Sequence, residues 1–321
     1  MKPKTKTINI TIINGGVGDM VAALTPIDYI LRKYPWVTPL IWMPDLMVDL
    51  ARNLLPEGTQ VYSYTEMRGR YDPSRPTKTT QWDGHTSAMR LHCVDYAYIK
   101  LCDELPDVFD RNYLKLKNSE LHLPRVDVPR PDRYVVVTTG YTADVKEFRP
   151  EYVNEVVKYI KSRGREVVFL GSTASETGGN HVIRGTFSQN IDYSQGINLV
   201  DKTTLLEAAA VMDHAELVVG VDNGLLHVAG TTDTPIVGGF TFVTPESKMP
   251  YRYNKLGWAF WPVIPDDDLG CRFCQVTTNF LYGHDYRKCM HRGNNEELVN
   301  ACTKQLRPEK FIEGIGFFLR D

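Results

Sequence analysis

The hydrophobic residues of the chain fall into short continuous runs separated by stretches with helical spacing. In the first part of the chain, the runs predict strands at Ile8–Ile13, Leu40–Met43 and Gln60–Tyr64. The stretches between them, which reach about Lys33 and cover Leu46–Leu55, have the periodicity of helices. Strands that alternate with helices in this way are typical of a parallel sheet.

The second part of the chain begins the same alternation again. Its predicted strands are Tyr134–Thr139, Glu166–Gly171, Ile197–Val200, Glu216–Val221 and Pro235–Gly239. Its predicted helices are Pro150–Ser162, Thr203–Met212, Gly224–Thr231 and Pro308–Phe318. The last helix must pack on the rest of the protein, because one face carries Phe311, Ile312, Ile315 and Phe318.

A proline-rich segment separates the two parts. Pro124–Pro131 contains three prolines in eight residues, which is typical of a linker. We therefore predict an N-terminal domain at residues 1–127, a C-terminal domain at 128–307 and a final helix at 308–321 that packs back. The predicted fold class is α/β, with two Rossmann-like, doubly wound domains that face each other across a cleft.

Composition narrows the classes of function. The chain has 321 residues, 42% of them apolar, and a formal charge of −2, which gives no electrostatic case for nucleic acid or an anionic membrane. No signal peptide and no membrane span are expected, because no stretch approaches about 18 continuous apolar residues. We expect a cytoplasmic protein, in which the six cysteines are reduced thiols or metal ligands.

The run Leu217–Gly230 is the most informative stretch for chemistry. A buried strand ends there in Asp222, Asn223 and Gly224, and a helix that carries His227 follows at once. Such a turn presents free backbone N–H groups and the positive end of the helix dipole, which suit a diphosphate. Taken alone, His227 is more often a core histidine than a ligand-facing one.

A second glycine turn, Gly15–Asp19, follows the first predicted strand. Gly16 and Gly18 fit the first two glycines of a dinucleotide fingerprint, but Val21 stands where the third belongs. With Asp45 as a ribose ligand, a nicotinamide enzyme stays an alternative. Asp19 beside a pyrophosphate would be repelled, whereas a carboxylate at a helix start that faces a cleft suits a general base. The alternative for Asp19 is a carboxylate that only stabilises the helix dipole.

Both turns lie in segments that resemble a known family. Asn14–Asp19 with Leu24–Pro26 looks like the N-terminal signature of the heptosyltransferase-like glycosyltransferases, family 9. Leu199–Glu207, Ala215–Gly230 and Thr234–Val237 are similar to the donor-binding core of that family in order and spacing. The resemblance extends from the first strand to the final helix and is weak over residues 66–123.

The resemblance implies a GT-B fold and an inverting transfer of a sugar from a nucleotide diphosphate donor, by default a heptose from an ADP donor to a lipopolysaccharide-type saccharide. It places Asp19 on the catalytic base, which deprotonates the acceptor hydroxyl. It places Lys146 on a lysine that neutralises donor phosphate. The residues implied in donor binding are Gly16, Gly18, Lys146, Gly171, Asp222, Asn223, Gly224 and His227.

The acceptor is expected at a basic segment without periodicity, residues 66–86, in which Arg68 and Arg70 are the candidate contacts. A cationic, aromatic loop suits a phosphorylated saccharide, and it also suits a nucleic-acid backbone. One alternative is therefore a phage-type transferase that acts on a hydroxymethylated DNA base in a host cytoplasm. Another is a nucleotide-sugar-binding protein without turnover. A peripheral position at the inner membrane fits the lipopolysaccharide reading.

Four cysteines near the C-terminus have the spacing of metal ligands. Cys271 and Cys274 form a pair, and Cys289 and Cys302 complete a set suited to a structural zinc ion. The alternatives are a disulfide or buried thiols. No catalytic metal is expected, and Asp266–Asp268 is interpreted as a solvated turn rather than a metal-binding motif.

Overall fold

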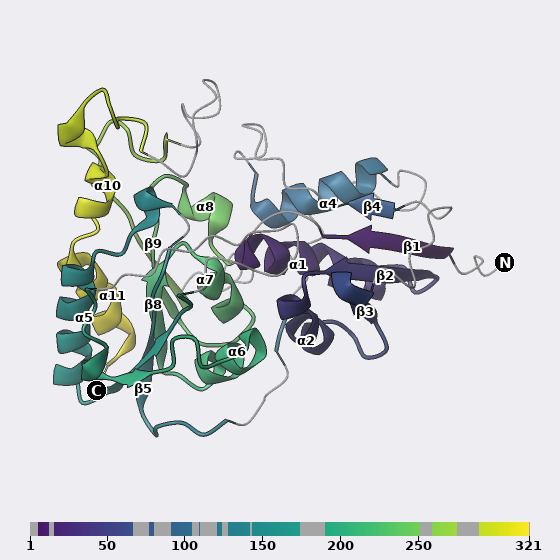
Figure 1. Ribbon diagram of the computed structural model, residues 1–321, viewed down its shortest axis with the longest axis horizontal. Coiled ribbons are helices and arrows are strands. Elements are labelled where there is room, and N and C mark those ends of the chain that lie inside the picture. Colours follow the sequence, from purple (N-terminus) through teal and green to yellow (C-terminus); the bar gives the residue numbers. More distant parts are fainter. Residues whose placement is uncertain are drawn as a thin grey trace.

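The computed structural model describes residues 6–12, 16–66, 77–79, 91–104, 109, 121–123, 128–141, 143–173, 190–250, 259–274 and 289–320. These residues form two parallel sheets, each with helices against it, and Figure 1 shows the two halves side by side. Within the described residues, no helix is both long enough and apolar enough to cross a membrane.

The N-terminal half is built on a sheet with the strand order β3-β2-β1-β4. Its strands are β1 (Lys6–Thr11), β2 (Val37–Met43), β3 (Gln60–Ser63) and β4 (Thr77–Thr79), and its helices are α1 (Val17–Lys33), α2 (Asp45–Leu54) and α4 (Cys93–Glu104). The predicted loop over residues 66–86 is wrong at β4, which pairs in parallel with β1. A strand of three residues is too short to give a periodic pattern.

The C-terminal half has a larger sheet with the order β10-β9-β8-β5-β6-β7. Its strands are β5 (Tyr134–Thr138), β6 (Glu166–Leu170), β7 (Ile197–Asn198), β8 (Leu217–Val221), β9 (Ile236–Gly239) and β10 (Phe260–Val263). Its α-helices are α5 (Pro150–Ser162), α6 (Leu205–Asp213), α7 (Gly224–Ala229), α8 (Pro245–Lys248), α10 (Ala301–Lys304) and α11 (Pro308–Phe318). Short 3₁₀ turns are η3 (Asp144–Lys146), η4 (Tyr193–Gln195) and η8 (Glu296–Leu298).

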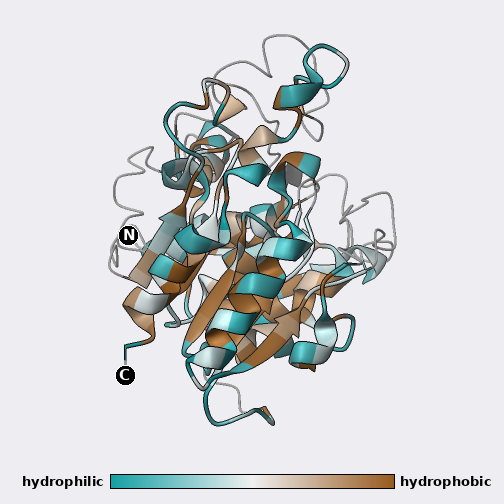
Figure 2. Cartoon of the chain, turned by 90° about the vertical axis from the view of Figure 1, so that its left-hand side faces the viewer, coloured by the Kyte–Doolittle hydropathy of each residue, from teal (hydrophilic) through white to brown (hydrophobic). Residues whose placement is uncertain are grey.

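The core forms where apolar strands meet amphipathic helices. Every residue of β5 and β8 is buried. Figure 2 shows brown strands behind helices that mix brown and teal. The predicted packing of the final helix is confirmed, because Phe311 of α11 is buried and stacks on Phe148 with ring centroids 4.3 Å apart.

The strand orders place a switch point in each sheet. In the larger sheet the chain leaves β5 towards β6 on one side and returns to β8 on the other, and in the smaller sheet β1 has β2 on one side and β4 on the other. Ligands of open parallel sheets bind outside the carboxyl ends of the strands at such points. The segments after β1, β5 and β8 are therefore the places to look for a site.

Candidate active site between the two halves

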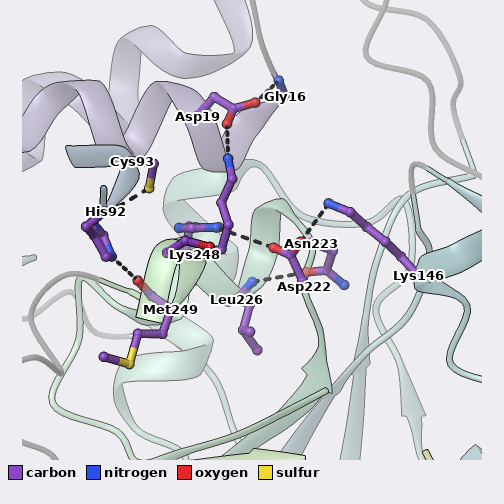
Figure 3. Close-up of polar contacts among 12 residues, drawn as sticks. Gly16, Asp19, His92, Cys93, Lys146, Asp222, Asn223, Leu226, Lys248 and Met249 are labelled. Carbon is purple, nitrogen blue, oxygen red and sulfur yellow. Dashed lines mark hydrogen bonds and ion pairs between the residues drawn. The ribbon is translucent and has the colours of Figure 1, made fainter. Parts of the chain in front are cut away.

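Asp19 lies in the first turn of α1, directly after the end of β1. Its Oδ2 accepts a hydrogen bond of 3.1 Å from the backbone N–H of Gly16, which fixes the carboxylate at the start of the helix. Its Oδ1 accepts a hydrogen bond of 2.9 Å from the ammonium of Lys248, which belongs to α8 of the other half (Figure 3). Both oxygens of the predicted base are thus held by defined donors.

Lys146 and Asp222 meet at the switch point of the larger sheet. Lys146 ends η3, after β5, and Asp222 follows β8. The Lys146 Nζ lies 2.7 Å from Asp222 Oδ2, and the two side chains are 15% and 5% exposed. His227 Nε2 lies 3.7 Å from the other oxygen of Asp222. Asp222 Oδ2 is buried, and the ammonium of Lys146 is its charged neighbour.

The two carboxylates are kept charged by the cations around them. Burial acts to raise the pKa of Asp222, but Lys146 and His227 outweigh it and the pKa lies well below its ordinary value. Burial acts in the same way on Asp19, and Lys248, followed by Lys146 and His227, holds its pKa below the ordinary value. The same positive groups act on both carboxylates, so Asp19 and Asp222 belong to one electrostatic cluster.

Asn223 maintains the turn between β8 and α7. Its Oδ1 caps α7 by accepting a 3.0 Å hydrogen bond from the N–H of Leu226, and its amide donates to Thr138 Oγ1 and to the carbonyl of Gly140. The local sequence explains the turn, because asparagine is among the strongest N-cap residues. Both polar ends of the Asn223 side chain are therefore engaged within the protein.

Two predicted donor-binding glycines allow α1 and α7 to approach closely. A Cβ on Gly18 would lie 2.5 Å from His227 Cδ2, and a Cβ on Gly224 would lie 2.7 Å from Val17 Cβ. Neither position has room for a side chain, so each glycine brings the two halves together. This packing role is separate from the phosphate contact that the sequence suggests.

The other two predicted glycines differ from each other. A Cβ on Gly171, just after β6, would lie 2.5 Å from the hydroxyl and 2.8 Å from the carbonyl oxygen of Thr139, so the ends of β5 and β6 touch there. A Cβ on Gly16 would meet no atom within 4 Å of the described structure. Gly16 contributes instead through its backbone N–H.

Sequence reasoning missed Lys248 and His92. His92 precedes α4, and its Nε2 lies 2.7 Å from the carbonyl oxygen of Met249 in the other half. Its Nδ1 accepts from the N–H of Val94, so Nε2 carries the proton and donates to Met249. Burial lowers the pKa of His92 to about 3, which keeps the ring neutral. Nothing in the local sequence around Lys248 or His92 indicates these contacts.

Several other predicted residues lie apart from this cluster. Arg68 and Arg70 fall outside the described residues. Asp45 accepts a hydrogen bond from Thr65, away from the Asp19 turn. Asp266 pairs with Arg307 at 3.0 Å and with Lys310 at 2.6 Å.

The four cysteines near the C-terminus lie close together. Burial raises the pKa of Cys302 to about 12, and the neighbouring Cys274, Cys289 and Cys271 act in the same direction. No disulfide joins them in the described structure. In that part of the chain, no three or more His, Cys, Asp or Glu side chains come together as ligands for one metal ion. The four thiols therefore lie in one region of the described structure, but they do not converge as ligands around one metal ion.

The cysteine segment packs on the turn that presents Lys146. Cys302 Sγ lies 4.0 Å from the carbonyl oxygen of Val145, which also accepts a hydrogen bond from Thr241. Arg292 pairs with Asp144 at 2.8 Å. Contacts from the cysteine segment thus hold two of the three η3 residues, Asp144 and Val145, in place.

Sequence comparison finds relatives of this chain. The model of glycosyltransferase family 9 (heptosyltransferase) matches residues 90–259. The autotransporter heptosyltransferase Aah of Escherichia coli is 26% identical over 196 residues, which are 56% of this chain and 44% of that protein. Lipopolysaccharide heptosyltransferase 2 of Salmonella typhimurium is 28% identical over 100 residues, which are 31% of this chain and 28% of that protein. The matches thus span less than half the length of either relative.

Solved structures show the same fold. The iron-containing dodecameric glycosyltransferase TibC of enterotoxigenic Escherichia coli has a TM-score of 0.71 at 18% identity, over 99% of this chain and 77% of that chain. The ADP-heptose heptosyltransferase II of Escherichia coli has a TM-score of 0.63 at 14% identity, over 97% of this chain and 98% of that chain. The predicted GT-B fold is confirmed. Since the family match covers more than half of the 321 residues, the chain belongs to glycosyltransferase family 9.

Proposed function

We propose that this protein transfers a heptose from a nucleotide diphosphate donor to an acceptor hydroxyl with inversion, and that Asp19 is the general base. The observation that carries the proposal is the electrostatic cluster across the two halves, in which Asp19 pairs with Lys248 and Lys146 pairs with Asp222. An inverting transfer needs a base for the acceptor hydroxyl and cations beside the departing diphosphate. Family membership, and the complex of TibC with ADP-D-β-D-heptose, support an ADP-heptose donor.

The proposed roles follow from charge and hydrogen bonding. Lys146 stabilises the diphosphate as negative charge develops on it. Asp222, whose carboxylate lies beside Lys146 at the switch point of the larger sheet, accepts a hydroxyl of the sugar. The backbone N–H of Gly224, at the start of α7, completes the contacts. Residues 1–127 form the acceptor side and residues 128–307 hold the donor. The helix 308–321 packs against the half that holds the donor.

Two experiments test the proposal in sequence. In a thermal-shift panel of nucleotide diphosphates, a ligand at 100 times its Kd should stabilise the protein by about 2.7 kcal/mol. Asp19→Asn should then abolish sugar transfer and leave binding of the donor nearly unchanged, whereas the exposed Asp268→Asn serves as a control. If no nucleotide diphosphate stabilises the folded protein, the transferase proposal fails. If Asp19→Asn retains wild-type turnover, Asp19 is not the base.

Two classes of acceptor molecule fit the proposed transfer. A lipopolysaccharide-type saccharide is the first, with Arg68 and Arg70 as its contacts and the cytoplasmic side of the membrane as its place. A hydroxyl of an autotransporter protein is the second, because the autotransporter heptosyltransferase Aah matches the larger share of this chain. Radiolabelled ADP-heptose offered with a core saccharide, an autotransporter passenger domain or hydroxymethylated DNA decides by which product carries the label. Arg68→Ala and Arg70→Ala should raise the acceptor KM and leave the donor KM unchanged.

A structural metal ion at Cys271, Cys274, Cys289 and Cys302 is a further part of the proposal. Its support is the proximity of the four thiols and the iron described for TibC. Thiolate sets of this kind suit zinc or iron, and an ion would have to draw the sulfur atoms together. Elemental analysis of the purified protein should find about one metal ion per chain, lost in a Cys271→Ser/Cys274→Ser variant. A metal content near zero in the folded protein would remove this part.

A further inference from the structure

Lys248 is a buried cation from one half of the protein that ends on the proposed base of the other half. It is the last residue of α8, its side chain is 10% exposed, and its Nζ lies 2.9 Å from Asp19 Oδ1. The two residues are 229 positions apart in the sequence. A buried ammonium needs a counter-charge, and burial without one would be strongly unfavourable. Asp19 supplies the nearest counter-charge and Asp222 adds to it, so the ion pair of Lys248 requires contact between the halves.

A second contact fixes the backbone next to Lys248. His92 of the N-terminal half donates a hydrogen bond of 2.7 Å from Nε2 to the carbonyl oxygen of Met249. Pro250 packs so tightly against the end of α7 that a Cβ on Gly230, the C-cap residue, would clash with it. The segment 248–250 therefore has little freedom to move away from Asp19 while the halves are closed.

The contact leaves Asp19 able to accept a proton. A carboxylate has about four acceptor positions, and the described structure occupies one on each oxygen, from Lys248 and from the N–H of Gly16. Each oxygen therefore keeps capacity for an acceptor hydroxyl, while rotation of the carboxylate is opposed at both ends. General-base catalysis needs this combination of fixed orientation and open lone pairs.

We propose that Lys248 is a positioning residue for Asp19, which holds the base in its reactive orientation only when the two halves are closed. The inference rests on the function proposed above. It explains why the ion pair joins the halves at the base itself. Opening of the cleft would release the carboxylate and expose the ammonium to water, so the base would be assembled on closure and disassembled on opening.

The ammonium of Lys248 also affects the protonation of Asp19. The groups that face it are Lys248 from α8, Lys146 from η3, His227 from α7 and the thiol of Cys93 from α4. Burial raises the pKa of Asp19, and Lys248 is the foremost group that lowers it. Without the ammonium, burial remains while Lys146 and His227 still act, so the pKa of Asp19 should rise.

The test compares Lys248→Met, which removes the ammonium, with Lys248→Arg, which retains a cation, and with Lys158→Met on the exposed face of α5 as the control. The first measurement is the titration of the Asp19 carboxyl carbon by ¹³C NMR without ligand, assigned with Asp19→Asn. The midpoint should rise in Lys248→Met and stay near the wild-type value in Lys248→Arg and Lys158→Met. An unchanged midpoint in a folded Lys248→Met protein would overturn the inference, whether or not the protein transfers sugar.

The second measurement is transfer from ADP-heptose as a function of pH. In Lys248→Met, kcat should fall about 100-fold, the loss typical of a misplaced catalytic group. The donor KM should change less than about threefold, the acid limb of kcat should move to higher pH, and Lys248→Arg should recover most of the rate. A fall in kcat that is equal at every pH, with no change in the Asp19 titration, would make Lys248 merely structural.

If wild type transfers no sugar, the proposed function fails while the NMR titration still decides the role of Lys248. If Lys248→Met does not fold, Lys248→Gln keeps a hydrogen-bond donor without the charge and should also raise the Asp19 midpoint.

Discussion

One added methyl group at Gly18 tests how closely the two halves are packed. A Cβ at this position would lie 2.5 Å from Cδ2 and 3.1 Å from Cγ of His227. Non-bonded carbon atoms rest about 3.5–4.0 Å apart, so the ring or the helix must move by roughly 1 Å. The ring is 7% exposed and has little room to retreat. Overpacking of this kind destabilises proteins by about 1–3 kcal/mol.

Thermal unfolding measures the effect. A loss of 1 kcal/mol lowers the Tm of a unit of about 150–250 residues by roughly 2–4 °C, so Gly18→Ala should lower it by roughly 2–12 °C. The matched control is Gly270→Ala, because a Cβ there would meet nothing within 4 Å and the backbone has no positive φ. Its stability should stay within about 0.5 kcal/mol of wild type.

A double-mutant cycle isolates the contact. In a His227→Ala background the ring is absent, and the same Gly18→Ala change should be neutral or stabilising by up to about 1 kcal/mol, because alanine is the better helix former. The sign of the effect should therefore reverse between the two backgrounds. An equal loss of Tm in both backgrounds would refute the reasoning, since the damage would then come from somewhere other than the α1–α7 contact.

Three further predictions concern groups at the edges of the site. The pKa of His92 falls from 6.5 to about 3 on folding, so the unfolded chain becomes protonated at a higher pH than the folded protein. The contribution of neutral His92 to stability is therefore complete above pH 6.5 and is lost on acidification. Urea unfolding should show up to about 1.4 kcal/mol less stability per pH unit between pH 6 and 5, where the carboxylates are still ionised in both states, and His92→Gln should reduce that slope. Lys146→Met leaves the buried Asp222 without its nearest cation and should destabilise the protein by about 3–5 kcal/mol in urea unfolding, with partial recovery in Lys146→Met/Asp222→Asn. Gly171→Ala places a methyl group 2.5 Å from Thr139 Oγ1 and should lower the Tm, whereas Thr139→Ala, which removes that hydroxyl, should not fully restore it, because the carbonyl oxygen at 2.8 Å remains.

The sequence predicted most strands and helices because their residues carry strong local signals. The β5 and β8 runs are continuously apolar and buried throughout, and Pro150 and Pro308 mark the first residues of α5 and α11. The strand β10 gave no such signal, because Pro262 interrupts it. It lies at the edge of the sheet, where proline is tolerated.

The candidate site was predictable only where its residues follow strands. Asp19 and Asp222 both follow buried strands, so topology brings them to the facing edges of the two sheets. Lys248 is the last residue of a four-residue helix, and its partner is fixed by how the halves meet, which no local pattern encodes. Gly18 was interpreted as a phosphate-loop glycine, although the described contact that requires it is the close approach of His227.

The balance of charge in the cleft leads to a last prediction, for Asp222→Asn. Two carboxylates, Asp19 and Asp222, face two ammonium groups, Lys146 and Lys248, so an incoming diphosphate adds unbalanced negative charge. At about 6 Å and an effective dielectric constant of about 20, one carboxylate repels a unit charge by roughly 3 kcal/mol. Asp222→Asn should therefore tighten the binding of ADP by tenfold or more in calorimetry, because the repulsion is lost and Lys146 is released. The same change removes the proposed acceptor of a sugar hydroxyl, so the affinity for ADP-heptose should gain much less than that for ADP. If both ligands instead bind more weakly and by the same factor, Asp222 supports the fold of the cleft and does not contact the sugar.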